Sequence, residues 1–113
     1  VPAVPFRELT TRRRGTDSAT VRARVVAARS AQRRRQGDTT NAELSGADLD
    51  RFAAMPDEAR VLLGQALTEL GLSARAYDKI RRVARTIADL EAAERVASHH
   101  VAEAVQYRQL DRA

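Results

Sequence analysis

The sequence has no cysteine and no tryptophan among its 113 residues, and only three prolines, two phenylalanines and two tyrosines. Without cysteine, the chain can form no disulfide framework, no thiolate nucleophile and no zinc finger. Its apolar runs are only a few residues long, so we expect no membrane-spanning segment and no membrane partner, and we find no signal-peptide pattern. We therefore predict a cytoplasmic protein of one domain, or a fragment of a larger protein.

Alanine and arginine dominate the composition, with 22 and 19 copies. Alanine, arginine, leucine and glutamate are good helix formers, whereas the strand-favouring aromatic residues and isoleucines are scarce. We predict an all-α fold, a small bundle of four to five helices.

The net charge of +5 is unevenly distributed. Residues 1–36 carry ten arginines against Glu8 and Asp17, whereas residues 37–113 carry ten basic and thirteen acidic residues. A basic segment beside a near-neutral body suits contact with nucleic acid or an acidic protein surface, although a long solvated helix also needs charge. The candidate nucleic-acid contacts are Arg22, Arg29 and Arg33.

Local patterns predict the helix boundaries. Pro2 and Pro5 oppose helix formation, so we expect an extended or disordered connector over 1–16 and a helical domain over 17–113. The first helix should begin at Asp17 or Ser18, which are competent N-caps, and end near Gln36. The other helices are expected at 46–54, at 56–70 with Gly71 as the C-terminal stop, at 73–91 capped by Ser73, and from Ser98 onward.

The expected helix over 73–91 has the pattern of an amphipathic helix. On its polar face, Asp78–Arg82 and Arg85–Asp89 are spaced as i,i+4 ion pairs. Its buried stripe should comprise Tyr77, Ile80, Val83, Ala84, Ile87 and Leu90.

The sequence contains no glycine-rich phosphate loop and no Ser/His/Asp set, so we expect no catalytic residue in this chain. His99 and His100 are its only histidines. Neighbouring side chains on a helix point about 100° apart, and no other His or Cys can complete a ligand set. We therefore predict surface histidines and no metal site.

Four blocks of sequence, taken in order, resemble the pattern of a known family. The first is the pattern of Ser18, Arg22, Arg24-Val25, Ala28-Arg29 and Gln32 in the first expected helix. The second is Asn41-Ala42 with Leu44, the third is LSARAY at 72–77 followed by IRRVARTIADL at 80–90, and the fourth is HVAEAVQYR at 100–108 with Leu110-Asp111. Together they cover nearly all of residues 18–112, and in their order and gaps they resemble bacterial magnesium-chelatase-like AAA+ ATPases of the ComM type.

The resemblance implies the C-terminal lid of an ATPase module, a helical bundle that closes over ATP and Mg²⁺ bound by an α/β core. The phosphate loop would then lie in that N-terminal core of the same chain. Proteins of the ComM type are hexameric motors that act on branched DNA in natural transformation, and they share their ancestry with the magnesium chelatase ATPase subunit. The full-length protein from which this chain would come, called the parent below, would thus be an ATPase, whereas this chain alone would have no activity.

The family pattern places its "sensor 2" arginine at Arg75, in the first turn of the helix expected at 73–91. A guanidinium beside the positive end of a helix suits the γ-phosphate of ATP. From spacing alone, Arg75 is equally an exposed helix residue. Arg82 and Arg85 are possible secondary contacts to nucleotide or to a neighbouring subunit, although the expected ion pairs explain them as well.

Two other functions remain open. The helices expected at 56–70 and 73–91, with the Gly71-Leu72-Ser73 turn between them, resemble a helix-turn-helix, which would make the chain a standalone DNA-binding module with Arg75, Lys79 and Arg82 toward DNA. The chain could instead be an assembly module that buries its first helix against another subunit.

Overall fold

The computed structural model describes the backbone of residues 3–112 and the side chains of residues 18–108. Within residues 3–112 there is no strand, which confirms the all-α prediction. The elements are α1 (Ala3–Gln36), the short 3-10 helix η1 (Asn41–Glu43), α2 (Gly46–Phe52), α3 (Asp57–Leu70), α4 (Ala74–Leu90) and α5 (Ser98–Arg112). None of the helices in this described part is both long and apolar enough to cross a membrane.

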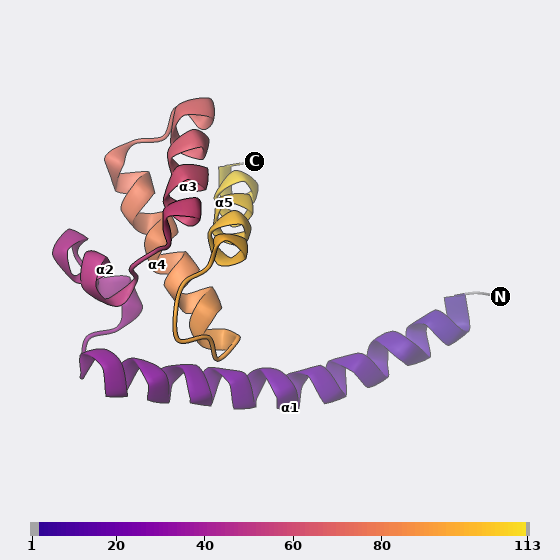
Figure 1. Ribbon diagram of the computed structural model, residues 1–113. Helices are drawn as coiled ribbons and strands as arrows, with labels where there is room; N and C mark the ends of the chain where they lie inside the picture. The colour runs from indigo at the N-terminus through magenta and orange to yellow at the C-terminus, as the bar shows by residue number, and fades with distance from the viewer. Residues whose placement is uncertain (1–2, 113) are drawn as a thin grey trace.

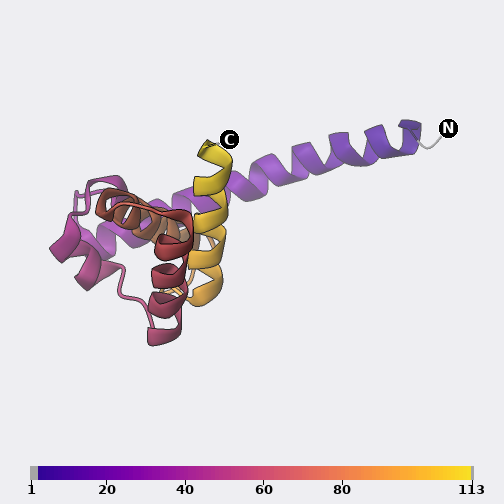
Figure 2. The ribbon, with the colours of Figure 1, turned by 90° about the horizontal axis from the view of Figure 1, so that it is seen from above.

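The helices are arranged around α4, which contacts α1, η1, α2 and α5, while α3 packs against α5. Figure 1 shows α1 lying across one end of the other helices, with α2 on one side of α4 and the pair of α3 and α5 on the other. Seen from above in Figure 2, α1 continues well beyond the bundle. The bundle is therefore built on α4, and α1 is attached to the bundle through the C-terminal part of α1.

The first helix begins earlier than we expected. It begins at Ala3, not at Asp17 or Ser18. Pro5 falls within its first turn, where a backbone N–H has no intrahelical acceptor, so the missing donor of proline costs nothing there. Residues 3–16 are thus helical and not extended as we expected, whereas the role of residues 1–16 as a connector stays a prediction.

The ends of α3 and α4 match the predictions made from capping residues. Gly71 ends α3 in the left-handed conformation, with φ 62° and ψ 40°, a region that glycine enters without steric cost. Ser73 caps α4 by accepting a hydrogen bond from the Ala76 N–H. The last helix, α5, begins at Ser98 as predicted, but Ser98 is its first helical residue and not the cap that we expected, and the Ala97 N–H donates to Nδ1 of His100.

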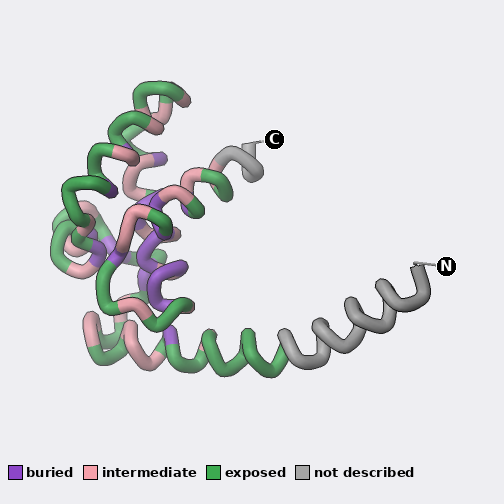
Figure 3. Tube along the Cα trace, turned by 45° about the vertical axis from the view of Figure 1, so that its right-hand side comes forward, coloured by how far each residue is buried: buried purple, intermediate pink, exposed green. Residues whose placement is uncertain are grey.

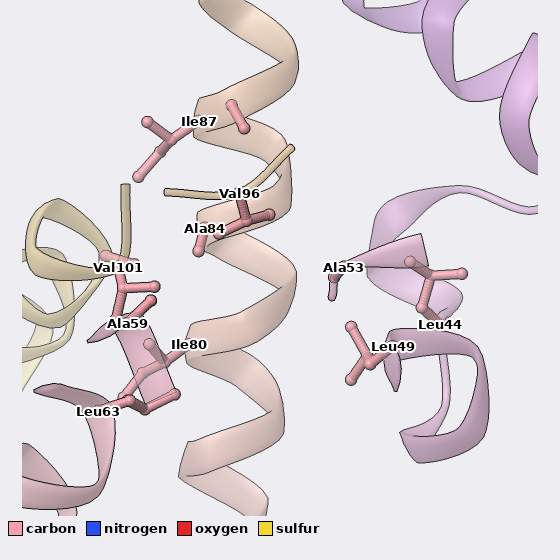
Figure 4. Close-up of a cluster of buried hydrophobic side chains, with 12 residues drawn as sticks. Leu44, Leu49, Ala53, Ala59, Leu63, Ile80, Ala84, Ile87, Val96 and Val101 are labelled. Carbon is pink, nitrogen blue, oxygen red and sulfur yellow. The ribbon is translucent and has the colours of Figure 1, made fainter. Parts of the chain in front are cut away.

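The core lies on two sides of α4 (Figure 4). Leu44, Leu49 and Ala53 pack on the side of α2, whereas Leu63 and Val101 bring α3 and α5 to the other side. In Figure 3 the buried part of the chain is concentrated on α4. Of the stripe predicted on this helix, Ile80, Ala84 and Ile87 are buried and Tyr77, Val83 and Leu90 are half-buried.

A buried carboxylate joins α1 and η1 to α4. Asp89 is inaccessible to solvent and accepts two hydrogen bonds from Arg35 at 2.9 and 3.0 Å. It also accepts two from Arg85, at 3.1 and 2.8 Å, and one from the amide of Asn41 at 2.9 Å. Asn41 in turn donates to the Thr86 hydroxyl. Residues distant in the sequence thus meet at one buried acceptor.

The ion pair of Arg85 with Asp89 exists, but it lies in the interior and not on the polar surface where we expected it. The Arg85 side chain is 2% exposed and also donates to the carbonyl oxygens of Phe52, Ala93 and Glu94. Burial lowers the pKa of the Arg85 guanidinium, and the neighbouring Asp89 carboxylate opposes that shift. The i,i+4 spacing predicted the pair correctly, because it depends only on helix geometry.

A second polar cluster holds the turn between α4 and α5. Nε2 of His99 and Nε2 of His100 both lie 3.0 Å from the same carboxylate oxygen of Glu91. Because Nδ1 of His100 accepts the Ala97 N–H at 2.9 Å, the proton of the neutral ring is on Nε2 and is donated to Glu91. His100 is 1% exposed, so the prediction of two surface histidines was wrong for this residue.

We predict that Asp89→Asn removes a large part of the stability of the domain. It would leave the buried guanidinium of Arg85 and the half-buried one of Arg35 without a counter-charge, which costs about 3–5 kcal/mol out of the roughly 5–15 kcal/mol that stabilises a typical domain. Urea unfolding followed by circular dichroism measures the loss. The matched control is Asp50→Asn, whose side chain is 76% exposed and pairs with Arg81, and which should cost less than about 1 kcal/mol. Equal, small losses for both variants would contradict the role of Asp89.

We also predict an acid dependence carried by Glu91. Hydrogen bonds from His99 and then from His100 hold the pKa of Glu91 below its ordinary value of 4.5. A carboxyl whose folded-state pKa is lowered stabilises the fold above its unfolded pKa, and this stabilisation is lost as the pH falls through the folded pKa. The difference in unfolding free energy between the wild type and Glu91→Gln should therefore shrink as the pH falls from 5 to 3. A difference that stays constant over this range would refute the prediction.

Candidate functional site

A groove of about 1020 Å³ lies between α1, α4 and α5, with η1 at its edge. Its apolar part comes mainly from α4, where Val83, Ile87 and Leu90 face it. Two acidic residues, Glu91 and Glu103, line it as well. The basic residues outnumber them: Arg24 from α1, Arg75, Lys79 and Arg82 from α4, and Arg108 from α5. The groove therefore carries a net positive lining, which suits an anionic ligand.

Arg75 lies where the sequence predicted it, in the first turn of α4 and on the wall of the groove. The side chain is exposed, and among the described residues it has no hydrogen bond or ion pair. The first backbone N–H groups of a helix have no acceptor within the helix, and in α4 the Ser73 hydroxyl accepts a hydrogen bond from one of them, the N–H of Ala76. Arg75 thus adds a full charge and forked donors next to the positive end of a helix dipole.

Arg82 also lines the groove, but it does not pair with Asp78 as we expected. Its Nε donates to the carbonyl oxygen of Leu44 at 2.8 Å, which ties α4 to the end of η1. Arg81, which is 7% exposed, forms ion pairs with both Asp78 and Asp50. The spacing allows Asp78 to pair with Arg81 at i,i+3 as well as with Arg82 at i,i+4. The contact of Arg81 with Asp50 depends on the position of α2, which cannot be read from spacing.

Arg85, the other secondary candidate, does not reach the groove. Its nitrogens are bonded to Asp89 and to backbone carbonyl groups in the interior. We therefore do not assign it a ligand.

The three arginines of the first helix that we predicted as nucleic-acid contacts differ in whether they line a hollow of the surface. Arg22, Arg29 and Arg33 are all exposed. Arg29 and Arg33 line a second hollow of about 550 Å³, which shares Ala42 and Thr86 with the groove. Arg22 lines neither hollow. Sequence reasoning missed Arg24 and Arg108, because which face of α1 and α5 turns toward α4 depends on the packing.

The cluster of Glu91, His99 and His100 has the composition of a metal site, with ligand atoms all within 4.8 Å of one another. A metal would need the lone pair of Nε2 on His100, and Nδ1 would then have to carry the proton. Nδ1 already accepts the Ala97 N–H, so that proton would face another donor. The donor set therefore fits a hydrogen-bonded turn better than a metal ion.

Comparison with known proteins places this chain among relatives. The family model described as "Magnesium chelatase, subunit ChlI C-terminal" matches residues 15–108. The chain is 42% identical over 99 residues to the uncharacterized protein YifB of Salmonella typhimurium, covering 88% of this chain and 19% of that protein. It is 41% identical over 113 residues to the competence protein ComM of Haemophilus influenzae, covering 99% of this chain and 22% of that protein. No solved structure matches the chain.

The chain thus spans about a fifth of the length of these relatives. The family match extends over most of the helical bundle and includes α4 with the groove. The sequence resemblance to magnesium-chelatase-like proteins is thereby confirmed, and this chain belongs to the family of the C-terminal domain of the magnesium chelatase subunit ChlI.

Proposed function

We propose that this chain is the nucleotide-sensing lid of a magnesium-chelatase-like AAA+ ATPase, in which Arg75 contacts the γ-phosphate of ATP. An N-terminal core of the same protein would hold the nucleotide and its Mg²⁺. The observation that carries the proposal is the exposed guanidinium of Arg75, which has no partner among the described residues and lies on a positively charged groove.

The chemistry of the γ-phosphate explains why such an arginine can report the nucleotide state. A guanidinium forms two parallel, charge-assisted hydrogen bonds to a phosphate group. Hydrolysis removes that group, so Arg75 loses its partner and the lid is released from the core. The lid itself needs no catalytic residue for this role, in agreement with the lack of a nucleophile or general base pattern in the sequence.

We propose further that the parent is a cytoplasmic hexamer that acts on DNA, as a branch-migration or helicase motor. The support is the similarity to a protein named for competence and the charge of α1, which carries six arginines and no acidic residue between residues 18 and 36. Arg22, Arg29 and Arg33 are the exposed candidates for contact with DNA phosphates.

A standalone helix-turn-helix is disfavoured by the position of α4. A recognition helix must present one face to a DNA groove, but α4 has eight buried residues and contacts four other elements. Arg82 would also have to leave the Leu44 carbonyl group to reach DNA. The geometry therefore supports a lid better than a DNA-reading helix.

We predict that Arg75→Ala in the full-length parent lowers the ATPase rate about tenfold or more while the fold survives. Losing a charge-assisted bond to the γ-phosphate costs about 1.5–3 kcal/mol, and about 1.4 kcal/mol corresponds to a tenfold change. Steady-state phosphate release measures the rate, and circular dichroism checks the fold. Arg95→Ala is the control, because Arg95 is also exposed but lies on the turn before α5, away from the groove. Near-normal turnover by the Arg75 variant would remove the sensor assignment.

We also predict that replacing Arg22, Arg29 and Arg33 together by alanine weakens the binding of this chain to duplex DNA. Each lost phosphate contact should lower the slope of log affinity against log salt by about 0.9. A salt titration by fluorescence anisotropy measures both quantities. The control triple variant replaces Arg51, Arg60 and Arg95, which removes the same charge from exposed positions outside α1. Equal losses for the two triple variants would show that only net charge matters.

A further inference from the structure

We propose that the outward face of α1 binds the outward face of α3 in a second copy of this chain, and that DNA competes for the same face of α1. The contact between copies goes beyond the proposed function, whereas the competition rests on the proposed DNA contact of α1. Each face consists of four exposed residues. They are Arg22, Val26, Arg29 and Arg33 on α1, the basic face, and Glu58, Val61, Gln65 and Glu69 on α3, the acidic face.

The basic face of α1 is turned away from the bundle. Its four residues follow each other at i, i+4, i+7 and i+11, a spacing that keeps them on one side of a helix. Ala28, which is 4% exposed, marks the different side of α1 that packs on the bundle. The three arginines have no hydrogen bond or ion pair among the described residues, and Val26 between them is 62% exposed. The face therefore presents an apolar side chain between unpaired cations.

The acidic face of α3 has the same construction with the opposite charge. Its four residues follow each other at i, i+3, i+7 and i+11, whereas Leu63 turns another side of α3 into the core. Within the described part of the chain, Glu58 and Glu69 are exposed and unpaired, and Val61 is 61% exposed. Arg60, the only basic residue of α3, already forms an ion pair within that helix. No cation on α3 thus neutralises this face.

The two faces match in length. Arg22 and Arg33 are eleven positions apart, and so are Glu58 and Glu69, which corresponds to about 16.5 Å along each helix. Two helices lying side by side can therefore bring an arginine beside a glutamate at both ends at once. Charges arranged in this complementary way fix the register of a contact and exclude other partners.

The valines decide the direction of the pair. When the helices lie parallel with their charged ends aligned, Val26 and Val61 are one residue out of step, about 1.5 Å, and Arg29 lies beside the neutral Gln65. In the antiparallel pair, Val26 would face Gln65 and Val61 would face Ser30. Among the large apolar side chains that the structure describes, these two valines are the most exposed. Only the parallel pair removes them from water against each other.

The contact joins different copies of the chain. In Figure 1, α1 lies across one end of the other helices and α3 lies farther along the bundle, and the basic face points away from both. The α1 of one copy thus meets the α3 of the next. Such head-to-tail contacts form a ring when the rotation between copies closes. Exposed ion pairs are individually weak and are screened by salt, so we expect a weak contact that dissociates at high salt.

The competition follows from the overlap of the two binding surfaces. DNA phosphates and the acidic face of α3 carry the same sign of charge and use the same three arginines. A helix that covers the basic face leaves no room there for a duplex. The neighbouring copy would therefore limit the access of DNA to α1, and DNA would release the neighbour.

Site-specific cross-linking tests the contact, because the chain has no cysteine and each introduced thiol is the only one in its copy. A chain with Val26→Cys is mixed with a chain with Val61→Cys, and a short bis-maleimide joins thiols that meet. The matched control uses Val21→Cys in place of Val26→Cys. Val21 is also exposed on α1, but it lies about 140° around the helix. Circular dichroism confirms that each variant is folded.

Charge exchange identifies the pairs. Adding Arg33→Glu to the Val26→Cys chain should lower the cross-linked fraction about tenfold, because like charges then meet across the contact. Glu69→Arg in the Val61→Cys chain should restore it, whereas Glu58→Arg, at the other end of the face, should not. Raising the salt from about 0.1 M to about 1 M should abolish the cross-link of the unaltered faces, since the screening length falls from about 10 to 3 Å.

Three results would overturn the contact. Equal cross-linking of Val21→Cys and Val26→Cys to Val61→Cys would reduce it to random collision. An Arg33→Glu chain that cross-links as well as its parent chain would show that the charges play no part. Rescue by Glu58→Arg in place of Glu69→Arg would exclude the parallel register.

Excess duplex DNA, added before the reagent, tests the competition and should lower the cross-linked fraction. An unchanged fraction would overturn the competition and leave the contact. The failures of the contact and of the proposed DNA binding are distinguishable. If the triple arginine variant loses affinity for DNA beyond its control but no specific cross-link forms, the contact fails and the DNA binding stands. If the cross-link is specific but the two triple variants bind DNA equally, the DNA binding by α1 fails and the contact stands.

Discussion

The arrangement of the bundle depends on the buried carboxylate of Asp89. It accepts five hydrogen bonds, and the donors come from α1, from η1 and from α4 itself. A buried charge is tolerated only when it is paired and fully hydrogen-bonded, so the carboxylate can exist there only with all its partners in place. Those partners position α1 across α4, because Arg35 reaches Asp89 only when the inward side of α1 faces it.

The groove follows from this attachment. Its walls are α1, α4 and α5, and the first two are held together by Asp89 at one end, while Arg82 ties the middle of α4 to the residue after η1. The turn from α4 to α5 is held by the hydrogen bonds of Glu91 with the two histidines and by those that Arg85 donates to the carbonyl oxygens of Ala93 and Glu94. Polar groups on α4 that point inward thus fix the neighbours of this helix, and those that stay outside, Arg75 above all, remain available to a ligand.

Much of the local structure was predictable from the sequence, because it depends on neighbouring residues. The glycine at 71 and the serine at 73 set the boundary between α3 and α4, since a left-handed stop and a hydroxyl cap act within a few residues. The hydrogen bonds at the start of α5 were not predictable in the same way. Ser98 is a residue type that often caps helices, but here the Ala97 N–H donates to Nδ1 of His100, and the other ring nitrogen, Nε2, is hydrogen-bonded to Glu91 across the turn.

The candidate site divides in the same manner. Arg75 could be found because its family pattern and its place in the first turn of a helix are properties of the sequence. Three features of the site could not be predicted from the sequence. They are the burial of Arg85, the pairing of Asp78 with Arg81 in place of Arg82, and the presence of Arg24 on the groove. Each depends on which face of one helix meets another, and spacing along a single helix does not contain that information.

By itself, the sequence determined that this protein is helical, where most of its helices end, and to which family it belongs. These properties arise from residue propensities, caps and patterns that act within a few turns of chain. Only the tertiary structure decided which charges are structural and which are free for a ligand. An arginine beside an aspartate is the same pair on a surface or in a core, and its meaning changes once packing removes the water around it.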